Sequence, residues 1–508
     1  MTADSSRLKT ITLRSLDIQA IVWLGLPMLL FLCGWMRWYI ALPLCAAILW
    51  AAVRQFRCHA PKQSRRSADP ATGEWRGVRF SAGYAATIAA LLLVLVFLGM
   101  GGFVAQHWDY QWRNAVFFDL ARRDWPVVYD PGSPTLLCYY IGFWLPASVV
   151  SRITSYIMPG DIAQLLWGWW GMAIGYSFVV SRLGGRARWW ILPVMLFTGF
   201  CDSILFGYFR EPIARVLGLA CPEDVYAYYM TFSLTAQLRM IFNQTIPLWV
   251  ALPLLWRRRR DPGSLLLPAS FLFLFSPLPC VGISVAVFYW LIRGGKRSLT
   301  FPNAIGLAVT AVTGLFYMTN NNAASTAPTA TAGPATIFAL GVLFLLCLGV
   351  CVPLVWQRVR HNTTFWILLA TAFLLPFLSL GDSDDLGRRA AMPLTIMLTY
   401  MLLGELRRWR VLTVWKKVAL PAVMLLGTYD ACHMVDMTLR EIEKYRDTGP
   451  KLIYLMGRLD DPEYNYHYNN FIATGESFYT RHMMRRLAGN GDCEVTKGVK
   501  DERGGDED

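Results

Sequence analysis

The chain has 508 residues, of which 55% are hydrophobic and 16% charged, and its formal net charge at pH 7 is +14. Soluble domains usually carry about 25% charged residues, so this composition excludes an ordinary soluble domain. The 11 Cys residues are scattered, without a CxxC spacing or a Cys/His cluster, so neither a disulfide framework nor a zinc site is predicted. The positive charge is not a nucleic-acid signal, because Lys and Arg form short clusters between apolar runs.

The apolar runs predict an all-α, polytopic membrane protein with about 13 crossings. Uncharged stretches near 20 residues, such as 82–97 and 337–356, are typical of membrane-spanning helices. The run 265–292 is broken by SPLP at 276–279, so we expect two short buried helices that go out and back, with a half-depth hairpin as the alternative. The expected spans are 18–34, 38–53, 81–104, 162–180, 189–206, 241–256, 265–292 (twice), 302–318, 334–356, 364–380, 390–404 and 418–432.

The basic clusters orient these helices, because Lys and Arg favour the cytoplasmic side of a membrane. The N-terminus is predicted to be cytoplasmic, with an uncleaved first span, and the C-terminus extracytoplasmic. All basic clusters lie on the cytoplasmic side only if residues 105–160 begin and end on the outer side of the membrane. The apolar segment 136–153 is therefore predicted to be re-entrant or interfacial. The clusters lie at 54–79, 182–188, 257–260, 293–297, 358–361 and 407–417.

Four regions are expected along the chain. Residues 1–80 form a two-span unit with a basic cytoplasmic linker, and residues 81–432 form the transmembrane core with its outer loops. Residues 433–490 form a small extracytoplasmic cap, within which 437–445 has the i, i+4 charge pairing of a helix. The Gly- and acid-rich residues 491–508 are predicted to be a disordered tail.

One predicted outer segment, HWDYQWRNAVFFDLARRDWPVVYDP at 107–131, combines carboxylates, guanidinium groups and indoles. Glycosyl transfer to a hydroxyl needs a carboxylate as general base, and Arg binds a phosphate through two parallel hydrogen bonds. Sugar rings stack on Trp and Tyr, so the segment suits a site for a sugar carried on a lipid phosphate. The alternative is a solvated loop with the aromatic belt of a membrane interface. Its candidate substrate-binding residues are Trp108, Trp112, Arg113, Arg122 and Arg123.

Two aspartates of this segment are candidate catalytic residues. If 108–120 is one helix, Asp109 and Asp119 lie roughly 15 Å apart along its axis, too far to act on one bond together. Asp109 has Arg113 at i+4, and Asp119 has two arginines at i+3 and i+4. We expect one catalytic acid, with Asp109 preferred over Asp119. The alternative is two surface ion pairs that orient a helix.

A second polar cluster, GDSDDLGRR at 381–389, falls on another predicted outer loop. Its acids are candidates for binding a metal ion or the acceptor. Its two arginines run against the charge bias of outer loops and are candidates for a phosphate clamp. A solvated turn is the alternative. The residues concerned are Asp384, Asp385, Arg388 and Arg389.

Three further polar residues stand near the outer ends of spans. Asn243 and Gln244 could bind sugar hydroxyls, although helix capping is the role we expect. Asp202 is costly at its depth unless it is paired or functional, and Arg210 and Arg239 are its candidate partners. The span interiors otherwise carry almost no ionisable groups, which argues against an ion-coupled transporter.

These features resemble the GT-C class of membrane glycosyltransferases: an apolar first unit, an outer loop with Asp and aromatic residues, many short spans and an outer C-terminal region. More narrowly, WDYQWRNAVFFDLARRDWPVVYDPGSPTLLCYYIGFWLPASVV, TGFCDS, FNQTIP and SDDLGRRAAMP resemble segments of a group of bacterial multi-span membrane proteins, over about residues 80–480. The resemblance implies a bacterial cytoplasmic (inner) membrane, a polyprenyl-phosphate sugar donor and a catalytic Asp, here Asp109 with Asp119 second. A divalent metal ion (Mg or Mn) is left open, because the loop has no clear pair of adjacent acids.

The sequence therefore predicts a hexosyl- or pentosyltransferase of the cell envelope. It would move a sugar from a polyprenyl-phosphate donor to a glycan, lipid or protein acceptor at the outer face of the membrane. Its partners would be membrane lipids and these substrates, without nucleic acid. Two alternatives stay open. A transporter or flippase for a lipid-linked glycan would need a polar path through the bundle, and a non-catalytic assembly factor for an envelope polysaccharide would need a stable partner.

Overall fold

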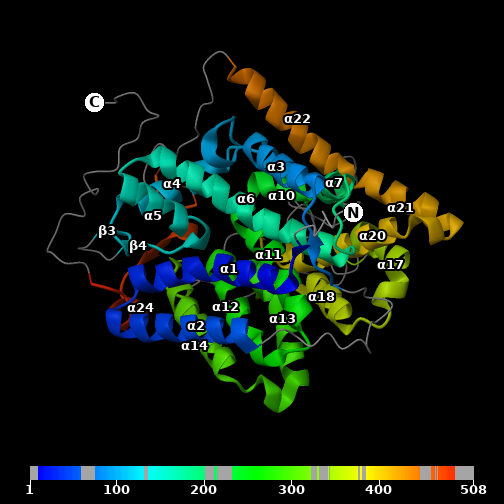
Figure 1. The fold of residues 1–508 in the computed structure, drawn as a ribbon. Helices are drawn as coiled ribbons and strands as arrows, with labels where there is room; N and C mark the ends of the chain where they lie inside the picture. The colour runs from blue at the N-terminus through cyan, green and yellow to red at the C-terminus, as the bar shows by residue number, and fades with distance from the viewer. Residues whose placement is uncertain are drawn as a thin grey trace, which may run out of the picture.

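The fold is known from a computed structural model, and most of the chain is helical (Figure 1). Within the described residues, four helices are long and apolar enough to cross a membrane, Leu13–Trp35, Trp38–Gln55, Pro277–Ser298 and Val414–Lys444, and shorter apolar helices accompany them. The predicted helical fold is confirmed, and these apolar helices are consistent with a membrane protein, whereas the number of about 13 crossings stays a prediction. The structure describes residues 10–58, 75–130, 135–200, 232–321, 344–375, 385–446 and 467–486, with short pieces at 211–212, 214–215, 329–330, 341, 378–379, 459–463 and 465.

The N-terminal helix packs in the centre of the bundle. Trp23, near its middle, stacks between Trp167 and Phe275, with ring centroids 4.9 and 5.3 Å away. Its indole N–H donates to the Trp167 carbonyl over 3.0 Å, so this buried donor is satisfied. The first elements are β1 (Thr10–Ile11), α1 (Leu13–Trp35), α2 (Trp38–Cys58), β2 (Val78–Arg79), α3 (Ala82–Phe97) and η1 (Met100–Gly102), with β1 and β2 antiparallel.

The next elements carry the predicted outer segment. Its expected helix is confirmed as α4, and α5 packs between α4 and α6. With 10 residues α5 is only about 15 Å long, too short to cross a bilayer. Just before α5, Phe143 contacts Trp23 with centroids 6.4 Å apart, so the chain there lies beside the middle of α1. The re-entrant or interfacial course of 136–153 stays a prediction. These elements are α4 (Tyr110–Arg122), β3 (Val128–Asp130), β4 (Thr135–Leu137), η2 (Ile141–Phe143), α5 (Leu145–Thr154) and α6 (Ile157–Arg182).

The break predicted at 276–279 separates two helices. α12 ends at Phe275 and α13 begins at Pro277, where the proline is compatible with a first helical turn. Because α12 has 10 residues, it is only about 15 Å long, whereas Pro277–Ser298, which contains α13, is long enough to cross a membrane. The prediction of a short helix therefore holds for α12 but not for α13. This part contains α7 (Ile191–Phe197), α10 (Leu234–Met240), α11 (Phe242–Arg258), η4 (Pro262–Ser264), α12 (Leu266–Phe275), α13 (Pro277–Gly294), η5 (Gly295–Ser298) and α14 (Phe301–Tyr317).

The C-terminal part includes one long rod, α21 followed by α22, at the edge of the bundle (Figure 1, orange). The helix predicted at 437–445 is confirmed as the end of α22. The elements are β5 (Thr329–Ala330), η6 (Leu345–Gly349, a π-helical turn), α17 (Cys351–Val359), α18 (Thr363–Leu374), β6 (Leu378–Ser379), α19 (Asp385–Ala390), α20 (Met392–Arg407), η8 (Trp409–Val411), α21 (Val414–Leu426), α22 (Thr428–Lys444), α23 (Tyr468–Phe471), β7 (Ile472–Thr474) and α24 (Phe478–His482).

The basic clusters meet at one end of the bundle, which we name the basic end. A buried carboxylate near the start of α1, Asp17, pairs with two arginines at the end of α11. A second buried carboxylate, Glu405 near the end of α20, pairs with a lysine and an arginine from two further clusters. The contacts that join the clusters are Asp17 to Arg257 and Arg258, Gln55 to Arg258, Ser181 to Arg76, and Glu405 to Arg358 and Lys416.

The C-terminal residues 467–486 cover the opposite end. β7 pairs with β4, which itself pairs with β3, so the predicted outer segment and the C-terminal region share one antiparallel sheet. The backbone N–H of Arg37, between α1 and α2, donates to the Met483 carbonyl over 2.9 Å. The amide of Asn320, just after α14, donates to the Cys138 carbonyl over 2.9 Å. The segment 107–130 therefore lies at the end away from the basic clusters.

Candidate functional site

Both predicted catalytic aspartates belong to α4, at opposite ends of it. Asp109 directly precedes its first residue, and Asp119 lies in its last turn. The two carboxylates therefore cannot act on one bond, as expected from a single helix. Each forms its own cluster. The Asp109 cluster consists of His107, Asp109, Arg113 and Arg239, and the Asp119 cluster of Asp119, Arg123, Tyr129 and Asp460.

The carboxylate of Asp109 is held by Arg113 and remains partly accessible, with 19% of its side chain exposed. The Arg113 Nη1 atom lies 3.3 Å from Asp109 Oδ2, which confirms the predicted i, i+4 pair. The described contacts of this carboxylate all fall on Oδ2. The other oxygen, Oδ1, is thus the one that can accept a proton from a bound molecule.

His107 supports Asp109 as a neutral imidazole. Its Nδ1 accepts the backbone N–H of Asp109 over 3.3 Å, which places the ring proton on Nε2. Burial lowers the pKa of His107 to about 4; Asp109 raises it, and the charges of Arg239 and Arg113 lower it. At neutral pH His107 therefore adds no positive charge, and the two arginines supply it.

Arg239 brings a distant helix to the Asp109 cluster. Its side chain is 1% exposed, and its Nη2 donates to Glu441 of α22 over 2.6 Å. Its Nη1 donates to the Met434 carbonyl over 3.3 Å, while its Nε is buried without a hydrogen-bond partner. The sequence suggested Arg239 only as a partner for Asp202, which lies outside the described residues.

Asn243 is a buried amide that the protein does not satisfy. The expected capping role is wrong for it and for Gln244, because Ile241 occupies the cap position of α11 and no side chain caps the helix there. Gln244 accepts instead from the Ser276 hydroxyl over 3.3 Å. Asn243 is 1% exposed, and both its Oδ1 and Nδ2 lack partners. Such a group costs about 1–3 kcal/mol per unpaired atom, so it suits a polar ligand.

Asn243 adjoins the Asp109 cluster through its neighbour in α11. The ring of Phe242 stacks on Tyr110 of α4, with centroids 5.5 Å apart. The Arg113 guanidinium lies 6.0 Å from the centroids of both rings. The start of α11 and the start of α4 therefore meet around one arginine, which places the unsatisfied amide on the same side of the bundle as Asp109.

The Asp119 carboxylate is engaged on both oxygens. The Tyr129 hydroxyl donates to Oδ2 over 2.6 Å, and Arg123 Nε donates to Oδ1 over 3.4 Å, as the i, i+4 spacing predicts. Burial raises the pKa of Asp119; Tyr129 and Arg123 lower it, and the nearby charge of Asp460 raises it. The remaining predicted partner, Arg122, lies over the Phe118 ring at 4.9 Å.

The two tryptophans of this segment play different parts. Trp108 is 50% exposed, and its ring contacts His107 and Trp112. Trp112 is 5% exposed, and its indole N–H donates to Asn465 over 3.0 Å while His467 packs on its ring. Trp108 is thus the ring that a sugar can reach, whereas Trp112 anchors the C-terminal region.

Arg388 and Arg389 lie beside α10, the helix that also carries Arg239. They line a small cavity of about 10 Å³ together with Gln237. The Gln237 Nε2 donates to the Phe232 carbonyl over 2.7 Å, and its Oε1 is buried without a partner. The clamp arginines and the Asp109 cluster are therefore adjacent to one short helix. Of the acids predicted with them, Asp384 and the side chain of Asp385 lie outside the described residues.

Neither a metal-binding cluster nor a comparison with known proteins identifies the function of this site. Within the described ranges, no three His, Cys, Asp or Glu side chains come together in a way that could hold a metal ion. No family matches the chain, and no curated protein or solved structure matches it either. The geometry of the site alone carries the functional inference.

Proposed function

We propose that this protein is a membrane glycosyltransferase of the GT-C type. It moves a hexose or pentose from a polyprenyl-phosphate donor to an envelope acceptor at the outer face of the bacterial cytoplasmic membrane. In this proposal about 13 crossings place the N-terminus and the basic end in the cytoplasm. The Asp109 cluster and the C-terminal cap then lie outside, at the height of the lipid phosphate.

One observation carries the proposal: a partly exposed carboxylate, two arginines and an unsatisfied buried amide gather at the end of the bundle away from the basic clusters. Each residue type matches one need of glycosyl transfer. A carboxylate accepts the proton of the attacking hydroxyl, and guanidinium groups stabilise the departing phosphate. The Asn243 amide pairs with sugar hydroxyls, and the exposed ring of Trp108 stacks on the sugar ring.

The reaction follows from these positions. The acceptor oxygen bonds to the anomeric carbon of the sugar, and the bond from that carbon to the phosphate oxygen breaks. The phosphate leaves with the electron pair, in the field of Arg113 and Arg239. The acceptor proton passes to Oδ1 of Asp109, while Arg113 holds Oδ2 in place. Neutral His107 fixes the backbone of Asp109 without competing for the phosphate.

Asp109 suits the role of base better than Asp119 does. The Asp119 oxygens accept from Tyr129 and Arg123, so a proton from the acceptor would have to displace one of these bonds. Its raised pKa makes it more basic, which keeps it as the second candidate. The two are distinguished by separate substitutions, because they lie at opposite ends of α4.

The test uses the purified full chain, reconstituted in lipid, and a panel of polyprenyl-phosphate hexoses and pentoses. Asp109→Asn keeps the shape of the side chain but removes the base. We expect it to lower the transfer rate by about 100- to 10,000-fold, as for other lost general bases. Asp124→Asn is the matched control, because Asp124 belongs to the same segment but is 66% exposed and pairs with Arg152 at the surface.

Three results would count against this assignment. Transfer at the wild-type rate by Asp109→Asn, together with loss in Asp119→Asn, would move the base to Asp119. Movement of a labelled lipid-linked sugar between leaflets without transfer would favour the flippase. Retention of envelope polysaccharide assembly by both variants, with a stably bound partner, would favour the assembly factor.

A further inference from the structure

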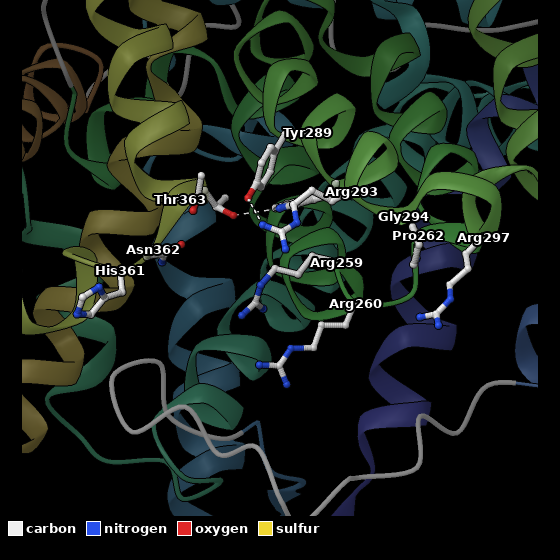
Figure 2. A pocket seen from close by; sticks show the side chains of 12 residues that line it. Arg259, Arg260, Pro262, Tyr289, Arg293, Gly294, Arg297, His361, Asn362 and Thr363 are labelled. Carbon is white, nitrogen blue, oxygen red and sulfur yellow. Dashed lines mark hydrogen bonds between the residues drawn. The ribbon is translucent and has the colours of Figure 1, made fainter.

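At the basic end, a cavity of about 420 Å³ opens between three helix ends (Figure 2). Its walls come from the turn after α11, from the end of α13 with η5, and from the turn between α17 and α18. Figure 2 shows Arg259, Arg260 and Arg293 one above another at its mouth, with Arg297 on one side and His361 on the other. Three segments far apart in the sequence thus supply the lining.

The lining carries four arginines and no carboxylate among its described residues. The Arg259 Nη1 donates to the Trp256 carbonyl over 2.8 Å, and Arg293 Nη1 donates to the Tyr289 hydroxyl over 3.3 Å. The Arg293 guanidinium is thus positioned by a neutral oxygen, which does not cancel its charge. The nearest acid in sequence, Asp261, accepts from the Ser264 hydroxyl over 2.8 Å. Arg293 and Arg297, both exposed at the cavity, therefore add positive charge that favours an anion there.

A helix N-terminus adds to this positive field. α18, with 12 residues, begins at Thr363 in the cavity wall, so its free N–H groups and dipole favour an anion there. Asn362 caps the helix through Oδ1, which accepts the Phe365 N–H over 3.4 Å. The Nδ2 of the same amide is buried without a partner and belongs to the cavity lining. This donor is available for an anion oxygen.

The apolar surface beside the cavity indicates where the anion comes from. On α13, Phe288 and Ile292 are 64% and 76% exposed, and Leu299, which follows η5, is 83% exposed. Arg293 and Arg297 follow directly on this surface. A lipid could therefore lay its acyl chains along α13 while its headgroup enters the cavity. A soluble phosphate would make no use of the exposed apolar side chains.

We propose that this cavity binds the phosphate headgroup of an anionic phospholipid. Arg259, Arg260, Arg293 and Arg297 hold the phosphate oxygens, the Asn362 amide and the start of α18 donate to them, and the acyl chains lie on α13. Basic pockets between membrane helices on the cytoplasmic side bind anionic headgroups for the same physical reasons. The site is distinct from the Asp109 cluster and does not depend on the transferase proposal, because it lies at the other end of the bundle.

The experiment measures lipid binding to the purified full chain by native mass spectrometry and by the shift in Tm. The probes are cardiolipin, phosphatidylglycerol and phosphatidylcholine in mixed micelles, with inorganic pyrophosphate as the soluble arm. The test variant is the double substitution Arg293→Gln with Arg297→Gln, both of which are exposed at the mouth of the cavity. Arg408→Gln with Arg410→Gln is the control, because these arginines are also exposed at the basic end but do not line the cavity.

We expect wild type and control to retain cardiolipin and phosphatidylglycerol and to gain Tm with them, but not with phosphatidylcholine. The test variant should bind both anionic lipids at least about 10-fold more weakly, since a charge-assisted hydrogen bond contributes about 1.5–3 kcal/mol. Equal losses in the test and control variants would overturn the proposal, because they would reflect charge alone. A Tm gain with pyrophosphate but not with anionic lipid would also overturn it, in favour of a soluble phosphate ligand.

Discussion

Asp17 is a buried carboxylate on which the basic end depends, and its neutralisation should be the most damaging single change there. Its side chain is about 4% exposed, and its oxygens accept from Arg257 Nε over 3.0 Å and from Arg258 Nε and Nη2 over 3.1 and 3.0 Å. Asp17→Asn leaves two buried guanidinium groups without the carboxylate that pairs with them. Breaking a buried pair from one side costs about 3 to 5 kcal/mol, and we expect a loss of that size.

The assay is unfolding of the purified chain in mixed micelles with increasing SDS, followed by Trp fluorescence. The matched control is Asp436→Asn, which makes the same chemical change in an exposed ion pair. Asp436 Oδ2 lies 2.9 Å from Arg440 Nε, and the side chains of Asp436 and Arg440 are 50% and 77% exposed. That variant should lose no more than about 0.5 kcal/mol, as for other exposed i, i+4 pairs. The contrast between the two aspartates isolates the effect of burial.

A second substitution separates charge imbalance from lost packing. Adding Arg258→Gln to Asp17→Asn removes one of the two stranded charges and should recover about 1 to 2 kcal/mol of the loss. If Asp17→Asn costs less than about 1 kcal/mol, the start of α1 and the end of α11 do not form this pair. The arrangement of the basic clusters at one end would then be wrong.

Three further predictions concern the end of the bundle away from the basic clusters and the packing of the helices. Burial lowers the pKa of His107 from 6.5 to about 4, so between these pH values the unfolded chain binds a proton that the folded chain does not. The free energy of unfolding is therefore full above pH 6.5 and falls by about 3 kcal/mol towards pH 4. His107→Gln should flatten this pH dependence in the same SDS assay. Trp112→Phe removes the 3.0 Å bond to Asn465 and should cost about 1 to 2 kcal/mol, seen as faster hydrogen exchange in 467–486 but not in α6. Gly282→Ala would place a Cβ 2.1 Å from the Ala390 carbonyl oxygen, so it should lower Tm by several degrees, whereas Gly314→Ala, with its nearest neighbour at 3.8 Å, should not.

Local patterns in the sequence predicted the parts of the structure that depend on local contacts. The helix considered at 108–120, the Asp109–Arg113 pair and the proline break before α13 all follow from spacings of a few residues. The grouping of the basic clusters follows from a rule about membrane sidedness that needs no tertiary information. These features could be predicted from the sequence because they depend on neighbouring residues in the chain or on the bilayer.

The parts that the sequence did not predict depend on long-range packing. Arg239 and Glu441 are 202 positions apart, and neither residue carries a motif that links it to the other. The capping role expected for Asn243 and Gln244 was wrong because α11 begins at Phe242, which packs on Tyr110, so both amides lie inside the helix. The arginines of the basic cavity were visible in the sequence, but only as topology signals. Three separate segments must fold together before they enclose a space.

The continuous rod of α21 and α22 has a mechanical consequence. Near its beginning, the ammonium group of Lys416 lies 3.8 Å from Glu405 at the basic end, and near its other end Glu441 holds Arg239 beside the Asp109 cluster. A helix resists stretching along its axis, so a displacement at one tip is felt at the other. The two ends of the bundle are thereby joined through a single strut, so a displacement at the basic end acts on the position of Arg239.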